Sequence, residues 1–403
     1  MKVLYLCWNY PSDANPAGGS FFCNQVEALQ TAGALVTVAT PVPYFPPLFR
    51  SLKQDWSKKA SLPRNYTYRG VQVYLPRFFR APYTLSLGLT PYAIVRAVEA
   101  LSLGRFDVVH GHFAYPFGFA AHLLSQRWNA RSALTLHGSD VNQYPYRSIR
   151  DRQRFVRAIN SVDAVMSVTE DMARQTEEFS GRRPIHLPIG IDVDRFRPKM
   201  SKAQARESLG IPYHYRVLIY VGALLDSKGV PELIEAAQGL PENVLVLVIG
   251  DGPLRDRVES CKRMRWIAPI ANDKVVDYLA ASDGFVLPSH SEGMPTVLVE
   301  AGAAGIPVAA TAVSGIPELL SEDRGILFPA KDIPALKSAI QKLVDDPAAA
   351  AARAQRLADY VRNRHDAKKN ARELVTIYNA ILESRDQSTV QPGTMADRAS
   401  ESM

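Results

Sequence analysis

Short apolar runs recur along the chain, and longer polar segments of helical character separate them. The runs are VLYLC, ALVTVAT, DVVHGH, SALTLHG and DAVMSVT in the first half, and RVLIYVG, VLVLVIGDG, GFVLPS, IPVAAT and GILFP in the second. Continuous β-branched runs of this length indicate parallel strands that are buried on both faces, with helices between them. Because the pattern occurs twice, we expect an α/β fold with two Rossmann-like, doubly wound domains.

The polar segment Arg195 to Tyr215 separates the two halves and is predicted to be a linker that contains one short helix. It divides the chain into a first domain of residues 1–195 and a second of residues 196–363. Terminal helices are predicted over residues 335–345 and 348–383. We expect the last of them, about residues 364–383, to pack back on the first domain, and residues 384–403 to form a disordered tail.

Composition narrows the class of protein further. The 403 residues are 47% hydrophobic and 22% charged, as is usual for globular proteins. The N-terminal run KVLYLCW is followed at once by Asn9 and has no cleavage site, and no stretch is apolar for long enough to span a membrane. The three cysteines have no metal-binding or disulfide spacing. We therefore expect a cytoplasmic protein.

The net charge of +7 comes from the first half of the chain. The basic residues that stand out there are Lys53, Lys58, Lys59, Arg64, Arg77, Arg80, Arg147, Arg150, Arg152, Arg154 and Arg157. They would suit the inner face of an anionic membrane or a phosphorylated acceptor, but the arginine run would equally be the solvated outer face of a helix. Nucleic acid is not an expected partner, because no recognition motif accompanies the charge.

The most specific motif is SEGMPTVLVEA, from Ser291 to Ala301. A predicted strand ends just before it, and Pro295 stands where it would open a helix. The free N–H groups and the dipole of that helix would form an anion site, with Glu292 in the loop and Glu300 on the helix. A glycosidase pair needs carboxyl groups about 5–9.5 Å apart across a bond, which this arrangement does not favour. Hydrogen bonding to sugar hydroxyls fits better.

Glu292 and Glu300, with seven residues between them, resemble the E-x7-E motif of glycosyltransferase family 4. The resemblance extends from about residue 2 to residue 380 and implies a retaining enzyme of GT-B fold. It also implies that Glu300 binds the ribose hydroxyls of a nucleotide-sugar donor and that Glu292 lies near the donor sugar. The neighbouring Gly293, Met294 and Pro295 are then expected to contact the sugar and the phosphates.

A second motif, VGALLDSKG, runs from Val221 to Gly229. The turn at Gly222 follows a strand, and Lys228 is placed to neutralise charge on a departing diphosphate. The family usually has an arginine where Ala223 stands, so a basic residue elsewhere would have to balance the second phosphate charge. The resemblance implies that Gly250, in the turn IGDGPLR, and Ile270 line the base pocket.

The first domain supplies further candidates. Gly18 and Gly19 follow the first strand, and their amides would cradle a phosphate. His137 lies just past a strand end, where ligand crevices of such sheets form, and matches a family histidine that contacts the donor sugar. Asp140 and His112 are weaker candidates for the acceptor side, and His112 would equally be a satisfied core histidine.

The implied reaction moves a hexosyl unit to a hydroxyl of a glycan or lipid-linked acceptor, in polysaccharide or glycolipid synthesis. The nucleotide sugar is a substrate, so we expect no cofactor, and the lack of an Asp-x-Asp at a strand end predicts no metal. Two alternatives remain open. One is a sugar-nucleotide epimerase of the same fold, and the other is an inactive GT-B scaffold, which the missing arginine at Ala223 keeps possible.

Overall fold

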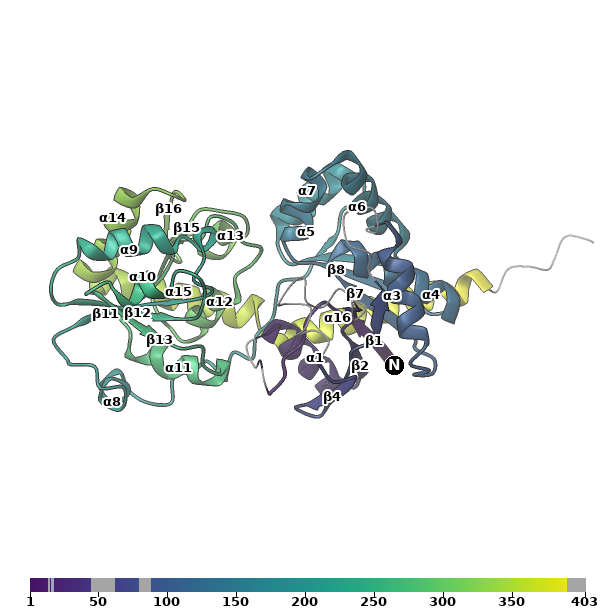
Figure 1. Cartoon of the computed structure of the whole chain (residues 1–403), viewed down its shortest axis with the longest axis horizontal. Coiled ribbons are helices and arrows are strands. Elements are labelled where there is room, and N and C mark those ends of the chain that lie inside the picture. Colours follow the sequence, from purple (N-terminus) through teal and green to yellow (C-terminus); the bar gives the residue numbers. More distant parts are fainter. Residues whose placement is uncertain (14, 16–17, 45–61, 80–87, 390–403) are drawn as a thin grey trace, which may run out of the picture.

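The chain folds into two lobes that face one another, and each lobe holds one central, mainly parallel sheet with helices packed against it (Figure 1). The computed structural model describes residues 1–13, 15, 18–44, 62–79 and 88–389. The predicted α/β class and the two Rossmann-like domains are confirmed.

The first lobe has an eight-stranded sheet in the order β10-β9-β8-β7-β1-β2-β5-β4, in which the pair β4–β5 is antiparallel. Its strands are β1 (Lys2–Leu6), β2 (Leu35–Ala39), β4 (Asn65–Tyr68), β5 (Val71–Tyr74), β7 (Val108–His112), β8 (Arg131–Leu136), β9 (Ala164–Ser167) and β10 (Ile185–His186). Val3 and Tyr5 of β1 belong to one core cluster and Leu4 and Leu6 to another, so both faces of the sheet are buried.

Helices connect these strands and cover the sheet. They are α1 (Ser20–Thr31), α3 (Thr90–Glu99), α4 (Phe119–Trp128), α5 (Ser139–Asn142), α6 (Ile149–Ser161) and α7 (Glu170–Ser180). A separate parallel pair, β3 (Val42–Tyr44) and β6 (Arg77–Phe79), lies beside the main sheet and was not predicted. Lys53, Lys58, Lys59 and Arg80, which the sequence marked as basic, lie outside the described residues.

The second lobe has a six-stranded, fully parallel sheet in the order β13-β12-β11-β14-β15-β16. Its strands are β11 (Arg216–Val221), β12 (Val244–Ile249), β13 (Met264–Ile267), β14 (Gly284–Leu287), β15 (Val308–Thr311) and β16 (Ile326–Phe328). Its helices are α8 (Lys202–Ser208), α9 (Val230–Gln238), α10 (Arg255–Glu259), α11 (Asn272–Ala281), α12 (Thr296–Ala303), α13 (Ile316–Leu320) and α14 (Ile333–Asp345). The short helix α8, opened by a capping box at Ser201 and Gln204, is the one predicted in the linker.

The C-terminal segment differs from its prediction in two ways. Residues 348–383 do not form one helix, because α15 (Pro347–Arg364) ends before His365 and α16 begins at Ala367. α16 (Ala367–Thr389) also continues past residue 383, so residues 384–389 are helical rather than part of a disordered tail. Residues 390–403 lie outside the described part of the chain.

α16 runs back along the first lobe, where it packs beside α1 and buries Leu374 and Tyr378 in the core of that lobe (Figure 1). The chain therefore crosses between the lobes twice, and the two crossings lie together. Ile191 forms an isolated bridge with Asp366, and a side chain at Gly190 would collide with the backbone of Ala367. Among the described residues, the chain passes between the lobes at this double crossing alone, a geometry that suits hinge motion.

None of the described helices is both long enough and apolar enough to cross a bilayer.

Candidate functional site

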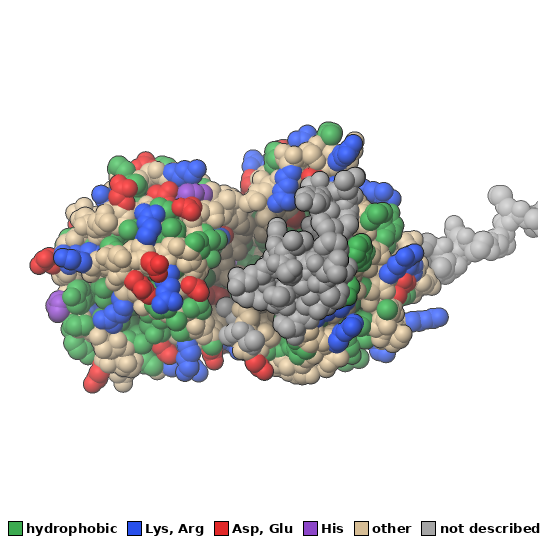
Figure 2. All heavy atoms as spheres, in the orientation of Figure 1, with side chains coloured by type: hydrophobic (Ala, Val, Ile, Leu, Met, Phe, Trp, Pro, Cys, Tyr) green, Lys and Arg blue, Asp and Glu red, His purple; other side chains and the backbone are tan. Residues whose placement is uncertain are grey.

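A cavity of about 500 Å³ lies between the lobes, within the usual size range of small-molecule sites. The carboxyl ends of β1 and β8 face it from the first lobe, and those of β11 and β14 face it from the second. Figure 2 shows the groove where the two lobes meet. Open parallel sheets bind ligands at the carboxyl ends of their strands. Here these ends of both sheets border the same cavity.

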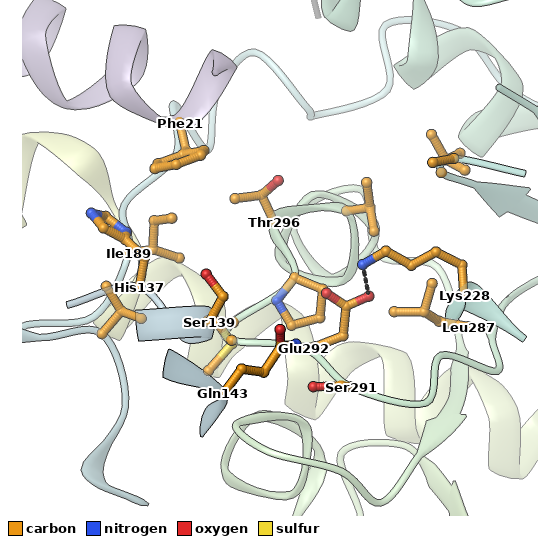
Figure 3. A pocket seen from close by; sticks show the side chains of 18 of the residues that line it. Phe21, His137, Ser139, Gln143, Ile189, Lys228, Leu287, Ser291, Glu292 and Thr296 are labelled. Carbon is orange, nitrogen blue, oxygen red and sulfur yellow. Dashed lines mark hydrogen bonds and ion pairs between the residues drawn. The ribbon is translucent and has the colours of Figure 1, made fainter. Parts of the chain in front are cut away.

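Lys228 and Glu292 meet inside this cavity. The Lys228 Nζ donates a hydrogen bond to Glu292 Oε1 at 2.7 Å, and the two side chains are 30% and 12% exposed. Figure 3 shows this pair facing Phe21 and His137 across the pocket. Lys228 ends a short turn, Asp226–Lys228, after β11, and Glu292 lies in the loop after β14. Neighbouring strands of one sheet thus bring together residues that are 64 positions apart.

The loop of Glu292 leads directly into α12, whose N-terminus lines the same cavity. Thr296 and Val297 are the first two residues of this helix, and their N–H groups have no acceptor within the helix. Pro295 takes the cap position just before the helix rather than its first turn. The site therefore offers one ammonium group and a helix N-terminus to an anionic ligand.

Gly293 is held against the first lobe. A Cβ atom at this position would collide with the carbonyl oxygen of His137, and one at Gly138 would collide with the backbone of Gly293. Asn142 adds a side-chain hydrogen bond to the carbonyl of Glu292, at 3.2 Å. The loop that carries Glu292 and Met294 is thus fixed from both lobes, and glycine is required for this approach.

A second cavity of about 580 Å³ adjoins the first, and Gly222, Thr296 and Val297 line both. The sequence-predicted residues that line the second cavity are Gly18, Gly19, Gly222, Gly250, Ile270 and Glu300. Ile270 lies after β13, which ends at Ile267. The predicted donor residues Lys228, Glu292, Gly293, Met294 and Pro295 line the first cavity. The two sets thus lie side by side as one elongated site.

Glu300 is the buried acid of the second cavity, with 3% of its surface exposed. Asn272, the first residue of α11, donates a hydrogen bond to Glu300 Oε1 at 3.2 Å. Burial raises the pKa of Glu300 to about 7, although the bond from Asn272 acts in the opposite direction. Glu300 thus places a buried carboxyl group with a perturbed pKa in the wall of the second cavity.

Three histidines form a row that runs from the first cavity, where His137 is half-buried, to the fully buried His112 and His110. His137 lines the cavity, and its Nε2 lies 2.9 Å from His112 Nδ1. The ring of His112 lies against that of His110, which is bonded to Tyr378 of α16 at 2.5 Å. Burial lowers the pKa of His137 and of His110 to about 3, so both rings are neutral near pH 7.

His112 is fully buried and lines neither cavity, as expected of the alternative, a core histidine. Every second residue of a strand points to the same face of the sheet, so His110 and His112 lie on one face of β7. That face is covered by α1 and α16. His112 therefore reaches the site only through His137.

Asp140 has a structural role that the sequence did not indicate. Its carboxylate accepts backbone N–H groups from Ala114 at 3.1 Å, His137 at 3.0 Å and Gly138 at 2.9 Å. Burial raises the pKa of Asp140, and these three hydrogen bonds act to lower it. Asp140 thus fixes the loop that carries His137, and its carboxylate oxygens are engaged by the backbone.

Within the described part of the chain, the basic residue that was expected to compensate for Ala223 does not line the site. Among the described residues that line the two cavities, Lys228 is the one lysine or arginine. Within the same described part of the chain, no group of three or more His, Cys, Asp or Glu side chains is placed to hold a metal ion. The positive potential of the site therefore comes from Lys228 and from the start of α12.

A carboxylate also links the lobes at the rim of the groove. Glu318 of α13 accepts the backbone N–H of Glu170, the first residue of α7, at 2.8 Å. The other oxygen of Glu318 lies 3.0 Å from His186 Nε2, in β10. Glu318 thus occupies the N-terminus of a helix in the opposite lobe, a favourable place for a negative charge.

Sequence reasoning missed several residues of the site. Trp8 and Phe21 line the first cavity, and Asn272 contacts Glu300. Ser314 lies in a turn before α13 and accepts the N–H of Glu292 at 3.4 Å. The dipeptide Ser314–Gly315 was a visible turn signal, but nothing in the sequence pointed to Asn272, because its partner is 28 residues away.

Comparisons with known proteins agree with this geometry. The family model described as Glycosyltransferase Family 4 matches residues 19–195, and that described as Glycosyl transferases group 1 matches residues 201–373. A Bacillus subtilis (strain 168) protein named as a teichuronic acid biosynthesis glycosyltransferase, TuaC, is 35% identical over 388 residues, which cover 95% of this chain and 100% of the relative.

Solved structures show the same fold. Sucrose-phosphate synthase from Thermosynechococcus elongatus superposes with a TM-score of 0.77 at 21% identity, over 95% of this chain and 100% of that chain. Anabaena HepE, solved in complex with UDP, gives a TM-score of 0.71 at 18% identity, over 94% of this chain and 100% of that one. These structures share the GT-B fold with this chain. The two family models and the relative TuaC show that the chain belongs to glycosyltransferase family 4 and is a glycosyltransferase of that fold.

Proposed function

We propose that the protein transfers a hexosyl unit from a nucleotide-diphosphate sugar to a hydroxyl of a glycan or lipid-linked acceptor, with retention of anomeric configuration. The observation that carries the proposal is the Lys228–Glu292 pair at the start of α12, beside the cavity that holds Glu300. The similar proteins TuaC and HepE support the proposed pathway and donor. TuaC is named for teichuronic acid synthesis, and HepE has also been solved with UDP-glucose.

In this proposal, the diphosphate lies where the two cavities adjoin, against the amides of Thr296 and Val297. Charge builds up on the diphosphate as the bond to the sugar breaks, and Lys228 stabilises that charge. Glu300 holds the ribose hydroxyls in the second cavity. Because Lys228 and the helix supply the positive potential, we propose that the reaction needs neither a metal ion nor a cofactor.

The donor sugar then occupies the first cavity, between Glu292 and His137. The acceptor hydroxyl attacks the anomeric carbon from the face that the diphosphate leaves, and the leaving phosphate oxygen takes the proton of that hydroxyl. The bond to the phosphate breaks as the bond to the acceptor forms, so configuration is kept. Closure of the lobes over this site excludes water, which would otherwise hydrolyse the donor.

A thermal-shift screen against UDP, GDP, ADP and their sugar conjugates tests the donor part of this proposal. We expect one nucleotide family to raise the melting temperature, and the anomeric coupling of the transfer product, measured by NMR, to match that of the donor. Conversion of the donor to a product with an inverted sugar centre, in the absence of any acceptor, would favour the epimerase alternative. No stabilisation by any nucleotide would favour the inactive scaffold.

Removing the negative charge of Glu318 is expected to favour the open form. Glu318→Gln weakens the bond from the N–H of Glu170, and a hydrogen bond to a charged group contributes about 1.5–3 kcal/mol. It also removes the charge that lies beside His186. We expect a several-fold higher ratio of donor hydrolysis to transfer, together with a larger radius of gyration in small-angle X-ray scattering. The exposed Glu322→Gln in the same lobe is the control, and an unchanged ratio would contradict this role.

We also propose peripheral binding to an anionic, cytoplasmic membrane face. In α6, Arg152 lies over the ring of Phe179 and Arg157 over that of Phe119, while Arg150 is exposed. Several basic side chains are visible at the end of the first lobe that α6 and α7 form, at the top of the view (Figure 2). Binding to phosphatidylglycerol vesicles should weaken as salt rises from about 0.05 to 0.5 M. Salt-independent binding, or none, would instead support a solvated helix face.

A further inference from the structure

A third cavity, of about 370 Å³, adjoins the transfer site on the side of the first lobe. It shares three lining residues, Trp8, Phe113 and Ser139, with the cavity that holds Lys228 and Glu292. All of its lining residues come from the first lobe, from loops and turns that follow β1, β7 and β8. None of its lining residues lines the second cavity, so a ligand seated there would reach the transfer site without entering the nucleotide cavity.

Aromatic rings form most of the wall of this third cavity. Its aromatic residues are Trp8, Phe113, Tyr115, Phe117 and Tyr144. The rings of Tyr115 and Tyr144 stack with centroids 5.9 Å apart and planes 16° apart, and Trp8 is 53% exposed. The C–H faces of a sugar ring are apolar while its hydroxyls lie at the edge, so flat aromatic surfaces suit a saccharide.

Arg147 gives the cavity a positive charge. Its guanidinium lies 5.7 Å from the centre of the Tyr144 ring, and the side chain is exposed. Arg154 nearby is neutralised by Asp151 at 2.9 Å, whereas Arg147 forms no ion pair with any residue in the described part of the chain. An unpaired guanidinium fork beside a stacking surface binds a carboxylate or a phosphate in bidentate fashion.

The one acidic residue of the lining does not cancel this charge. Asp140 directs its carboxylate oxygens to the backbone N–H groups of Ala114, His137 and Gly138. The negative charge of Asp140 is therefore already stabilised by backbone N–H groups. Arg147 is the charged group of the lining that remains available to a ligand.

We propose that the third cavity binds the acceptor, and that the acceptor is an acidic saccharide whose carboxylate or phosphate binds Arg147. Its sugar ring packs on the aromatic wall, and one of its hydroxyls points past Ser139 into the transfer site. This inference rests on the proposed function and adds the chemical class of the acceptor.

Calorimetric binding of three probes tests the proposal without requiring turnover. The probes are methyl glucoside, methyl glucuronide and glucose 6-phosphate, each added to the protein with and without the nucleotide found by the thermal-shift screen. We expect an acidic probe to bind at least tenfold more tightly than methyl glucoside. Preference for the glucuronide would identify a carboxylate, and preference for the sugar phosphate would identify a phosphate.

Arg147→Met is expected to abolish that preference and to leave nucleotide binding and donor hydrolysis unchanged. Arg150→Met, an exposed arginine that does not line the cavity, should retain the preference. Trp8→Ala should weaken all three probes together, since it removes part of the stacking wall. Equal binding of neutral and acidic probes, or an unchanged preference in Arg147→Met, would overturn the proposal. If the unmodified protein binds no nucleotide, that result would instead count against the proposed donor site.

Discussion

Replacing Lys228 by methionine is expected to lower kcat by roughly 10²–10³-fold while KM for the donor changes much less. The ammonium group acts on charge that develops only as the diphosphate leaves, so its loss weakens the transition state more than the bound ground state. Methionine keeps most of the length and apolar surface of the lysine stem. Steady-state kinetics with the donor identified by thermal shift measures both constants.

The Lys228→Met variant also leaves the carboxylate of Glu292 without its partner at 2.7 Å. Part of the lost rate would then be repulsion between Glu292 and the diphosphate. The double variant Lys228→Met/Glu292→Gln separates the two effects, because a partial recovery of kcat reports the repulsion. Lys262→Met, on an exposed lysine of the same lobe, is the matched control. A normal kcat in Lys228→Met would remove this residue from the site.

Most of the strands that the sequence predicted are buried on both faces. Runs such as VLVLVI in β12 have no polar position, and all six residues are buried. The strands β4 and β5 were missed because they form the antiparallel end of the sheet, with β4 at its edge, and alternate between polar and apolar residues, as in the sequence NYTY of β4. Edge strands face solvent on one side, so their pattern resembles that of a loop.

The predicted site residues share a different property, since they follow strand ends in recognisable turns. Glu292, Lys228 and His137 were identified in this way, and all three line one cavity. Contacts between distant elements leave no such local signal. The bonds of Asn272 to Glu300 and of Glu318 to α7 depend on how helices and lobes pack, which spacing along the chain does not encode.

Glu300→Gln is expected to weaken binding of the donor about 10–100-fold at pH 8, because charge-assisted hydrogen bonds to the ribose are worth about 1.5–3 kcal/mol each. In the unmodified protein, donor affinity should fall as pH drops through about 7, where Glu300 takes up a proton. The intact nucleotide sugar is the proper probe, because its diphosphate diester does not titrate there. Affinity that is independent of pH, or equal in the variant, would contradict the ribose role.

The same substitution is expected to stabilise the ligand-free protein. Burial raises the pKa of Glu300 from 4.5 to about 7, so the stability that this group contributes below pH 4.5 is lost as pH rises through 7. Above pH 8 the folded state therefore carries a charged, buried carboxylate at a cost of about 3 kcal/mol. Glu300→Gln removes that cost, and its melting temperature should exceed that of the unmodified protein at pH 8 but not at pH 4.5. The exposed Glu235→Gln should show neither effect. Weaker donor binding in a more stable protein cannot result from unfolding, so the two measurements together assign Glu300 to the ligand.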